Sequence, residues 1–132
     1  MSTKLYLSAA IALIGLTVLP TATFAAPTSS VRLVRLECHN TEDSTGADEA
    51  YLNYNGNRVF GIKKINDGQS RNIGVVKSLS GTATVSLYDE DWPDGDDFLG
   101  SIIIRADERG TGLRSQNFTR DGAFYTLFYR VD

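Results

Sequence analysis

The sequence predicts an all-β domain, either a sandwich or a barrel. Apolar and polar residues alternate in several short runs, which is the pattern of half-buried strands. Turn-forming pairs such as Asn-Gly and Asp-Gly recur at short intervals between these runs. Beyond the first 25 residues, no segment has the spacing of an amphipathic helix. These three observations argue against a mainly helical fold.

The first 25 residues have the organisation of a secretory signal peptide. Lys4 gives a positively charged n-region, and the following Leu5–Leu19 is almost entirely apolar. Small residues then precede a predicted cleavage site after Ala25. The apolar run is too short and wrongly flanked for a membrane span. We therefore expect a secreted protein with a leader at 26–30 and one domain at 31–132.

Composition narrows the classes of partner. The net charge is −3 and becomes −4 once Lys4 leaves with the signal peptide, so no basic face is available for nucleic acid. Cys38 is the only cysteine, which excludes an intramolecular disulfide. Its place in the strand-like run Val31–Cys38 indicates a small buried side chain, with an intermolecular bridge as the alternative. We assume a monomer.

The first predicted strand, Leu33–Cys38, leads into an acidic segment. The next element is a hairpin in which Tyr51–Tyr54 and Asn57–Phe60 flank Asn55-Gly56. Asn-Gly is the pair that a type I′ turn requires, because both central residues adopt positive φ. This hairpin is the clearest local prediction.

The remaining elements are strands separated by turns. Turns are predicted at Asp67-Gly68 and Asp121-Gly122, and a loop is predicted at Gly110–Gly112. Further strands are predicted at Ile73–Val76, Ala83–Tyr88, Phe98–Ile104 and Ala123–Val131. The sequence contains no internal repeat and no second domain.

Two acidic segments follow predicted strands. Six carboxylates fall within residues 89–97, and a second cluster occupies residues 42–49. Two like charges about 4 Å apart repel by about 4 kcal/mol at an effective dielectric of about 20. Either a cation holds these groups together, or the loops turn them out into solvent. Carboxylates suit hard cations, so calcium is the first candidate ion and magnesium the second.

The acidic run is not an EF-hand. Counted from Asp89, the fifth position is Pro93, the sixth is Asp94 and the twelfth is Gly100, where that motif needs an acid, a glycine and a glutamate. No flanking helices are predicted either. The sequence therefore points to another kind of calcium loop.

The spacing of Asp89, Asp91, Asp97 and Gly100 resembles the third calcium loop of C2 domains, the calcium and phospholipid modules of protein kinase C and synaptotagmin. The segment Asp43-Ser-Thr-Gly46-Ala-Asp48-Glu49-Ala-Tyr51 is similar to their first loop. It has one residue fewer before the second acid and lacks the family's proline, so either Asp48 or Glu49 fits the second ligand position.

This resemblance implies an eight-stranded antiparallel Greek-key β-sandwich with calcium held between loops at one end. It implies no ligand role for Glu90 or Asp96, which we expect to face solvent. The implied metal ligands are Asp43, Asp48 or Glu49, Asp89, Asp91 and Asp97, with Asp94 near a further ion.

Trp92 is the only tryptophan and lies in the middle of the acidic run. In C2 domains the apolar residues at this loop tip dip into lipid, a role that suits an indole ring. The alternatives are that the ring folds back over its own loop, or that it stacks on a sugar or a protein partner.

The sequence predicts no catalytic site. His39 and Cys38 are adjacent on a strand and should point to opposite faces, and no common hydrolase or phosphate-loop motif occurs. The predicted function is that of a secreted calcium-binding module that bridges to anionic phospholipid. The alternative is a secreted interaction protein, such as a toxin, inhibitor or sugar-binding module, with calcium in a structural role only. A third possibility is that the acidic loops serve only solubility.

Overall fold

The computed structural model describes residues 13–20, 28–43 and 45–132. Most of the predicted signal peptide lies outside the described residues, and residues 13–20 carry no secondary structure. No helix in the described part is long and apolar enough to span a membrane. The elements in chain order are β1 (Ser29–Asn40), β2 (Asp48–Tyr54), β3 (Asn57–Ile65), β4 (Ser70–Leu79), β5 (Thr82–Asp89), β6 (Asp97–Arg105), the 3-10 helix η1 (Ala106–Glu108), β7 (Arg114–Phe118) and β8 (Phe124–Val131).

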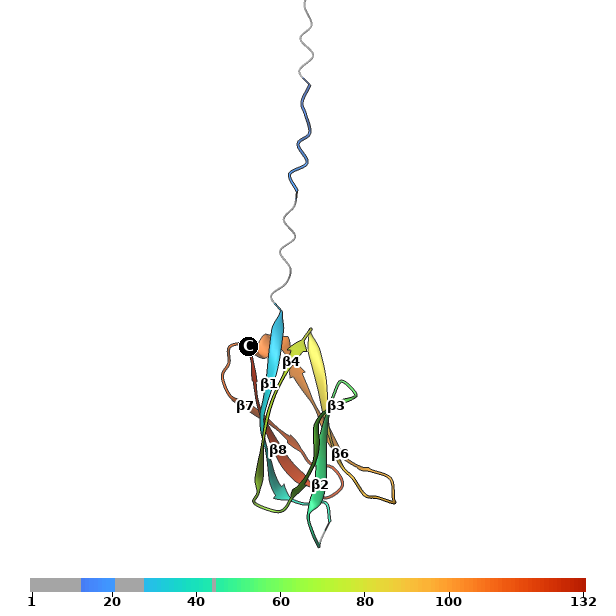
Figure 1. The fold of residues 1–132 in the computed structure, drawn as a ribbon. Helices are drawn as coiled ribbons and strands as arrows, with labels where there is room; N and C mark the ends of the chain where they lie inside the picture. Colours follow the sequence, from blue (N-terminus) through green and yellow to red (C-terminus); the bar gives the residue numbers. More distant parts are fainter. Residues whose placement is uncertain (1–12, 21–27, 44) are drawn as a thin grey trace, which may run out of the picture.

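The strands form two antiparallel four-stranded sheets packed face to face (Figure 1). One sheet has the order β4-β1-β8-β7 and the other has the order β3-β2-β5-β6. The chain crosses between the sheets after β1, β3, β4 and β6, so strands far apart in sequence become neighbours. This arrangement confirms the predicted all-β class and the single sandwich domain.

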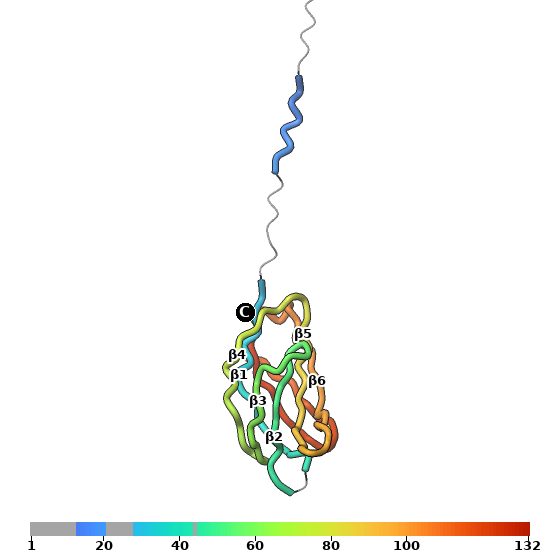
Figure 2. The backbone as a smooth tube through the Cα atoms, turned by 45° about the vertical axis from the view of Figure 1, so that its right-hand side comes forward, coloured from blue at the N-terminus to red at the C-terminus, as the bar shows by residue number. Residues whose placement is uncertain are grey.

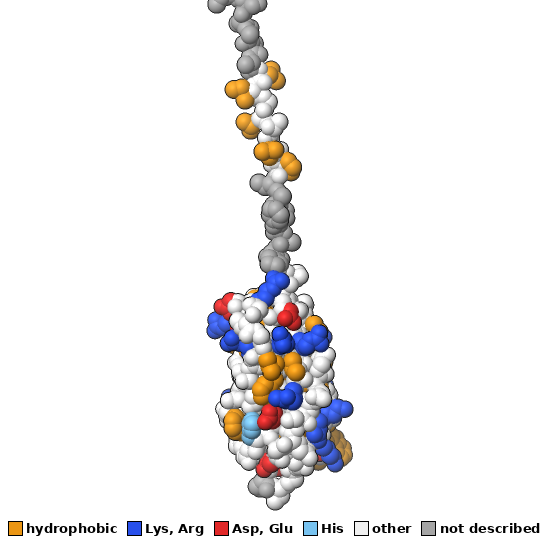
Figure 3. Space-filling model, turned by 90° about the vertical axis from the view of Figure 1, so that its left-hand side faces the viewer, with side chains coloured by type: hydrophobic (Ala, Val, Ile, Leu, Met, Phe, Trp, Pro, Cys, Tyr) orange, Lys and Arg blue, Asp and Glu red, His pale blue; other side chains and the backbone are white. Residues whose placement is uncertain are grey.

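Alternation along each strand builds the core between the sheets. In β1, Leu36 and Cys38 point inward and are fully buried. The next residue, His39, lies on the outer face of the β4-β1-β8-β7 sheet, where it is visible in Figure 3. The prediction that Cys38 and His39 face opposite ways is therefore confirmed. The largest fully buried side chains include Tyr125, Tyr129, Phe118, Leu33, Leu52, Leu87 and Ile104.

The predicted hairpin is confirmed by its backbone. Asn55 has φ 48° and Gly56 has φ 82°, the two positive values of a type I′ turn. The Asn55 side chain also accepts a hydrogen bond of 2.9 Å from the N–H of Thr84, which ties the turn to β5.

Most strands are longer than the runs predicted for them, and one strand was not predicted. β1 begins at Ser29, so the last two residues of the predicted leader are already in a strand. β7, Arg114–Phe118, was not predicted, because only Phe118 among its five residues is apolar. It is an edge strand, and its inward-facing Gln116 hydrogen-bonds to Tyr129 rather than packing as a hydrophobic residue.

The connections β1–β2, β3–β4, β5–β6 and β7–β8 lie together at one end of the sandwich (Figure 2). The N–H of Thr41 donates 2.8 Å to Asp67, and the N–H of Glu90 donates 3.0 Å to the carbonyl of Glu49. The first contact links the β1–β2 loop to the β3–β4 loop. The second contact links the start of β2 to the β5–β6 loop. Both acidic segments therefore belong to one cluster of loops.

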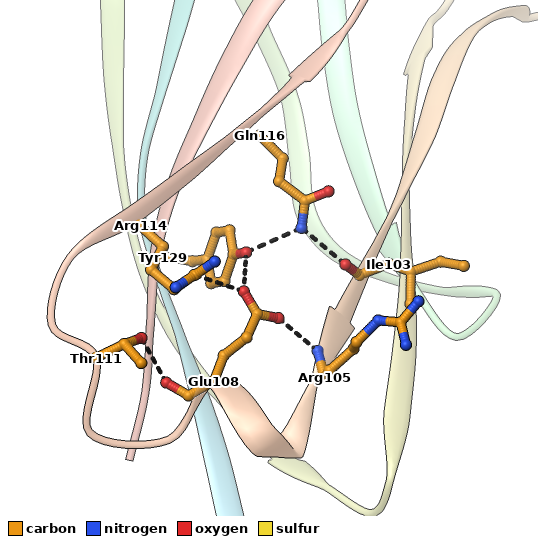
Figure 4. A network of polar contacts seen from close by, with 7 residues as sticks. All are labelled: Ile103, Arg105, Glu108, Thr111, Arg114, Gln116 and Tyr129. Carbon is orange, nitrogen blue, oxygen red and sulfur yellow. Dashed lines mark hydrogen bonds and ion pairs between the residues drawn. The ribbon is translucent and has the colours of Figure 1, made fainter.

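A polar network fastens the opposite end (Figure 4). The buried carboxylate of Glu108 accepts hydrogen bonds of 2.6 Å from Tyr129 and from the N–H of Arg105, and it pairs with Arg114 at 2.6 Å. Gln116 bridges Tyr129 to the carbonyl of Ile103. These contacts join β6, η1, β7 and β8, so this end holds the two sheets together away from the acidic loops.

Candidate metal centre

The two acidic segments meet where β2 begins and β5 ends. Glu49 donates its backbone N–H to Oδ1 of Asp89 at 2.6 Å, and Ala50 pairs with Asp89 in the β2–β5 register. On its other side, Asp89 pairs with Asp97 in the β5–β6 register. Carboxylates that are 40 or more residues apart in the sequence are thus brought to one place.

Seven acidic residues at this end form three overlapping groups. Within each group, one ligand atom from every member lies within 4.8 Å of the others. The groups are Glu42, Asp43, Asp48 and Asp89; Glu42, Asp91 and Asp97; and Glu49, Asp89 and Asp91.

Asp48 and Asp89 are the most informative members, because both are 0% exposed. Oδ2 of Asp48 accepts hydrogen bonds from Tyr125 at 2.5 Å and from the N–H of Glu42 at 3.0 Å. Oδ1 of Asp48 and Oδ2 of Asp89 have no hydrogen-bond partner. Burying a carboxylate oxygen without a partner is costly, so each of these oxygens needs a proton or a cation.

No basic side chain supplies that positive charge within the described residues. The ion pairs there are Arg35–Glu37 and Arg114–Glu108, and neither touches the acidic loops. Clustered carboxylates without a basic partner leave a metal ion or protonation as the ways to relieve their repulsion.

The pKa values of three of these acids are shifted upward as a result. Burial, together with the charges of Asp48 and Asp91, raises the pKa of Asp89 to about 8. Burial and the charge of Asp97 raise the pKa of Glu42 to about 7. Hydrogen bonding to Asp97, with burial and the Asp97 charge, raises the pKa of Asp91 to about 6. The site favours positive charge strongly enough to hold protons near neutral pH.

Six of the residues predicted as ligands come together, namely Asp43, Asp48, Glu49, Asp89, Asp91 and Asp97. Asp94 is exposed and belongs to none of the three groups, so its role stays a prediction. Glu42 was missed. Its position in the first acidic segment was the available signal, but the comparison of loop spacings placed the ligand at Asp43.

Asp96 was expected to face solvent without a role. It is exposed, but its carboxylate accepts a short hydrogen bond from the hydroxyl of Tyr51 on β2. The guanidinium of Arg58 lies 3.8 Å from the centre of the Tyr51 ring, which in turn stacks on Tyr88 at 5.2 Å. This contact anchors the acidic β5–β6 loop to the outer face of the sheet.

Trp92 lies at the tip of the same loop and is 87% exposed. The ring does not fold back over its own loop, so that alternative is wrong. An exposed indole beside a cluster of carboxylates is available for contact with a partner or a surface.

Gly100 closes the loop at the start of β6. Its φ is +131°, and a Cβ built there would lie 3.4 Å from Cα of Phe118 on β7. The register of β5 and β6 shifts at this point, between Leu87 and Tyr88. Glycine is therefore needed for the backbone angle at this irregularity.

Solved C2 domains share this fold. A structure described as a C2 domain gives a TM-score of 0.53 at 15% identity, over 79% of this chain and 98% of that one. A structure of extended synaptotagmin 2 that holds its SMP domain and two C2 domains gives 0.52 at 25% identity, covering 80% of this chain and 26% of that one. A calcium-bound structure of the two C2 domains of the same protein gives 0.51 at 23% identity, over 80% and 44%.

The chain therefore spans about a quarter of the first extended synaptotagmin 2 structure and less than half of the second. No family model matches the chain, and no curated protein sequence matches it. The fold is C2-like, as the resemblance of the acidic loops predicted.

Proposed function

We propose that this chain is a secreted calcium-binding module, without catalytic activity, that docks onto an anionic phospholipid surface. The observation that carries the proposal is the pair of fully buried aspartates, Asp48 and Asp89, each with an unpartnered carboxylate oxygen. Oxygen ligands from Asp and Glu are the set that calcium prefers, and the three acidic groups include no cysteine or histidine.

Calcium would be held by Asp48, Asp89, Asp91 and Asp97, with Glu42 and Asp43 from the first loop. Once bound, the ion neutralises the carboxylates that otherwise repel both one another and a negatively charged surface. The protein's own contribution is to hold these oxygens in place, through the N–H groups of Glu42 and Glu49 and the hydroxyl of Tyr125.

The exposed Trp92 supports the membrane part of the proposal. It projects from the loop that carries Asp91 and Asp97, so a surface that approaches the neutralised loops meets an amphipathic ring first. Without calcium, the same approach would bring a cluster of negative charges against anionic headgroups.

Thermal unfolding in calcium and in chelator tests the metal part. If calcium binds only the folded state, a hundredfold excess over Kd adds about 2.7 kcal/mol, which should raise the melting temperature clearly. An unchanged midpoint at millimolar calcium would contradict the proposal.

Sedimentation with vesicles of mixed neutral and anionic phospholipid tests the membrane part. We expect pelleting that requires calcium and that weakens strongly in Trp92→Ala. Phe124→Ala is the matched control, because Phe124 is an exposed aromatic residue on the outer face of the other sheet. Calcium binding without pelleting would instead favour a secreted interaction protein with structural calcium.

A further inference from the structure

We infer that a second copy of this chain docks its acidic β5–β6 loop, with Trp92 at the tip, onto the outer face of the β4-β1-β8-β7 sheet when calcium is absent. This contact replaces the monomer that we assumed from the sequence. The effect of calcium on the contact rests on the proposed function, whereas the contact itself does not.

The outer face of that sheet has the make-up of a protein interface. Figure 3 shows hydrophobic side chains in the middle of the face, with Lys and Arg side chains around them. Val76 on β4 is 49% exposed, and Phe128 on β8 is half-buried with the guanidinium of Arg35 4.2 Å from its ring centre. An apolar centre with a polar rim, rich in aromatic and arginine side chains, is typical of surfaces that bind another protein.

Two arginines on this face lie directly opposite each other. In the antiparallel register, Arg32 on β1 stands between Val76 on β4 and Arg130 on β8. Both arginines are exposed, and neither forms an ion pair within the described residues. Like charges directly opposite on neighbouring strands destabilise a sheet, so this pair favours an anionic group laid across it.

The β5–β6 loop of the same protein is complementary to this face. Its tip holds Trp92, which is 87% exposed, together with the exposed acids Asp94 and Asp96. Asp94 belongs to none of the three metal groups and makes no ion pair within the described residues. A tryptophan flanked by carboxylates matches an apolar centre rimmed by guanidinium groups, and Trp and Arg are prominent among the residues that dominate binding at protein interfaces.

The two surfaces do not face each other within one molecule. In Figure 1 the β5–β6 loop (gold to orange) projects from the side of the sandwich away from the β4-β1-β8-β7 sheet. The contact therefore joins two copies through different surfaces, and it leaves the loop of one copy and the face of the other open. Such a contact adds copies into a ring or an open row instead of closing a two-fold dimer.

Calcium should oppose this contact. An ion bound between the acidic loops removes negative charge from the surface that the arginines attract. Trp92 also cannot lie against a membrane and against a second copy at the same time. The same loop therefore joins copies of the metal-free protein and is released by calcium for the membrane contact proposed above.

Sedimentation velocity in chelator, at rising protein concentration and low ionic strength, tests the contact. The average mass of the wild type should increase with concentration and fall back in high salt, which screens the charges. Trp92→Ala and the double variant Arg32→Gln, Arg130→Gln should each stay monomeric. Lys63→Gln with Lys64→Gln is the matched control, because it removes the same charge from exposed positions on the other sheet, and it should associate like the wild type.

A mixture of the two defective proteins gives a sharper test. Trp92→Ala keeps an intact face and the double arginine variant keeps an intact loop, so an equal mixture should form one-to-one complexes that grow no further. A wild type that stays monomeric at millimolar concentration, or a mixture in which nothing associates, would overturn the inference. Association that survives the loss of both arginines would overturn it too.

Calcium separates this inference from the proposed function. Added calcium should disperse the wild-type assemblies. Association that stays unchanged in protein that has bound calcium would overturn the release by calcium. A wild type that associates in chelator but binds no calcium would contradict the proposed function and leave the contact between copies standing.

Discussion

The backbone N–H of Glu49 donates a 2.6 Å hydrogen bond to Oδ1 of Asp89, which fastens the start of β2 to the end of β5. One of the acidic side chains thus helps to build the frame that holds the others. The other oxygen of Asp89, Oδ2, is buried and has no hydrogen-bond partner. A proton or a cation at this oxygen is therefore needed to offset the cost of burying it.

Metal-free protein should lose stability as the pH rises from about 4 to about 8. Asp89 has an ordinary pKa of 3.8 and a folded pKa of about 8, so between these values the folded state holds a proton that the unfolded state has lost. Stability then falls with rising pH, by at most about 1.4 kcal/mol per pH unit for one such group. The folded pKa values of Glu42 and Asp91, about 7 and about 6, act in the same direction.

Urea unfolding in chelator at a series of pH values measures this slope. Asp89→Asn is the control, because the amide keeps the shape of the side chain but cannot titrate, and its slope should be shallower. Wild-type stability that rises steadily from pH 4 to pH 8 would contradict the protonated, metal-free site.

Glu108→Gln should destabilise the fold by about 2 kcal/mol at neutral pH and leave calcium binding unchanged. Burial alone would raise the pKa of Glu108, but hydrogen bonds from Tyr129 and the Arg105 N–H, with the charge of Arg114, hold it below its usual value. Hydrogen bonds to a charged group contribute about 1.5–3 kcal/mol, and the amide loses that charge.

The contribution of Glu108 to stability should also depend on pH in the acid range. Because its folded pKa is depressed, its contribution is present above pH 4.5 and is lost as the pH falls through the folded value. Urea midpoints of the wild type and Glu108→Gln should therefore converge in acid. A variant with a wild-type midpoint at pH 7 would show that this network is dispensable.

Gly100→Ala should cost about 1–3 kcal/mol. The new side chain would stand on a backbone with φ +131°, which residues other than glycine rarely adopt. Gly95→Ala is the matched control, because Gly95 lies in the neighbouring β5–β6 loop, has no positive φ, and a Cβ there meets nothing within 4 Å. Thermal unfolding of the two variants in chelator makes the comparison, and equal melting temperatures would refute the argument from the backbone angle.

Local signals in the sequence predicted most of the fold. Asn55-Gly56 specifies its own turn, because few other pairs tolerate two positive φ angles, and the buried strands alternate clearly. β7 gave no such signal. Its inward Gln116 is stabilised by Tyr129 and by the carbonyl of Ile103, partners that only the folded chain provides.

The candidate site was partly predictable for the same reason. Asp89, Asp91 and Asp97 lie within nine consecutive residues, and their spacing alone predicted that they bind one metal site together. The contact between Tyr51 and Asp96 joins residues 45 positions apart, so no short pattern contains it. Glu42 was missed because it precedes the segment Asp43–Tyr51 whose spacing was compared with the C2 loop.

Calorimetric titration of metal-free protein with calcium, run in parallel on the wild type and on Asp89→Asn, tests the central claim most directly. The wild type should take up calcium with saturable heat. Asp89→Asn, which alters the one residue common to the Asp48 and Glu49 groups, should lose most of that uptake while it stays folded. Identical uptake by the two proteins, or no uptake by the wild type, would contradict a cation held between the two acidic loops.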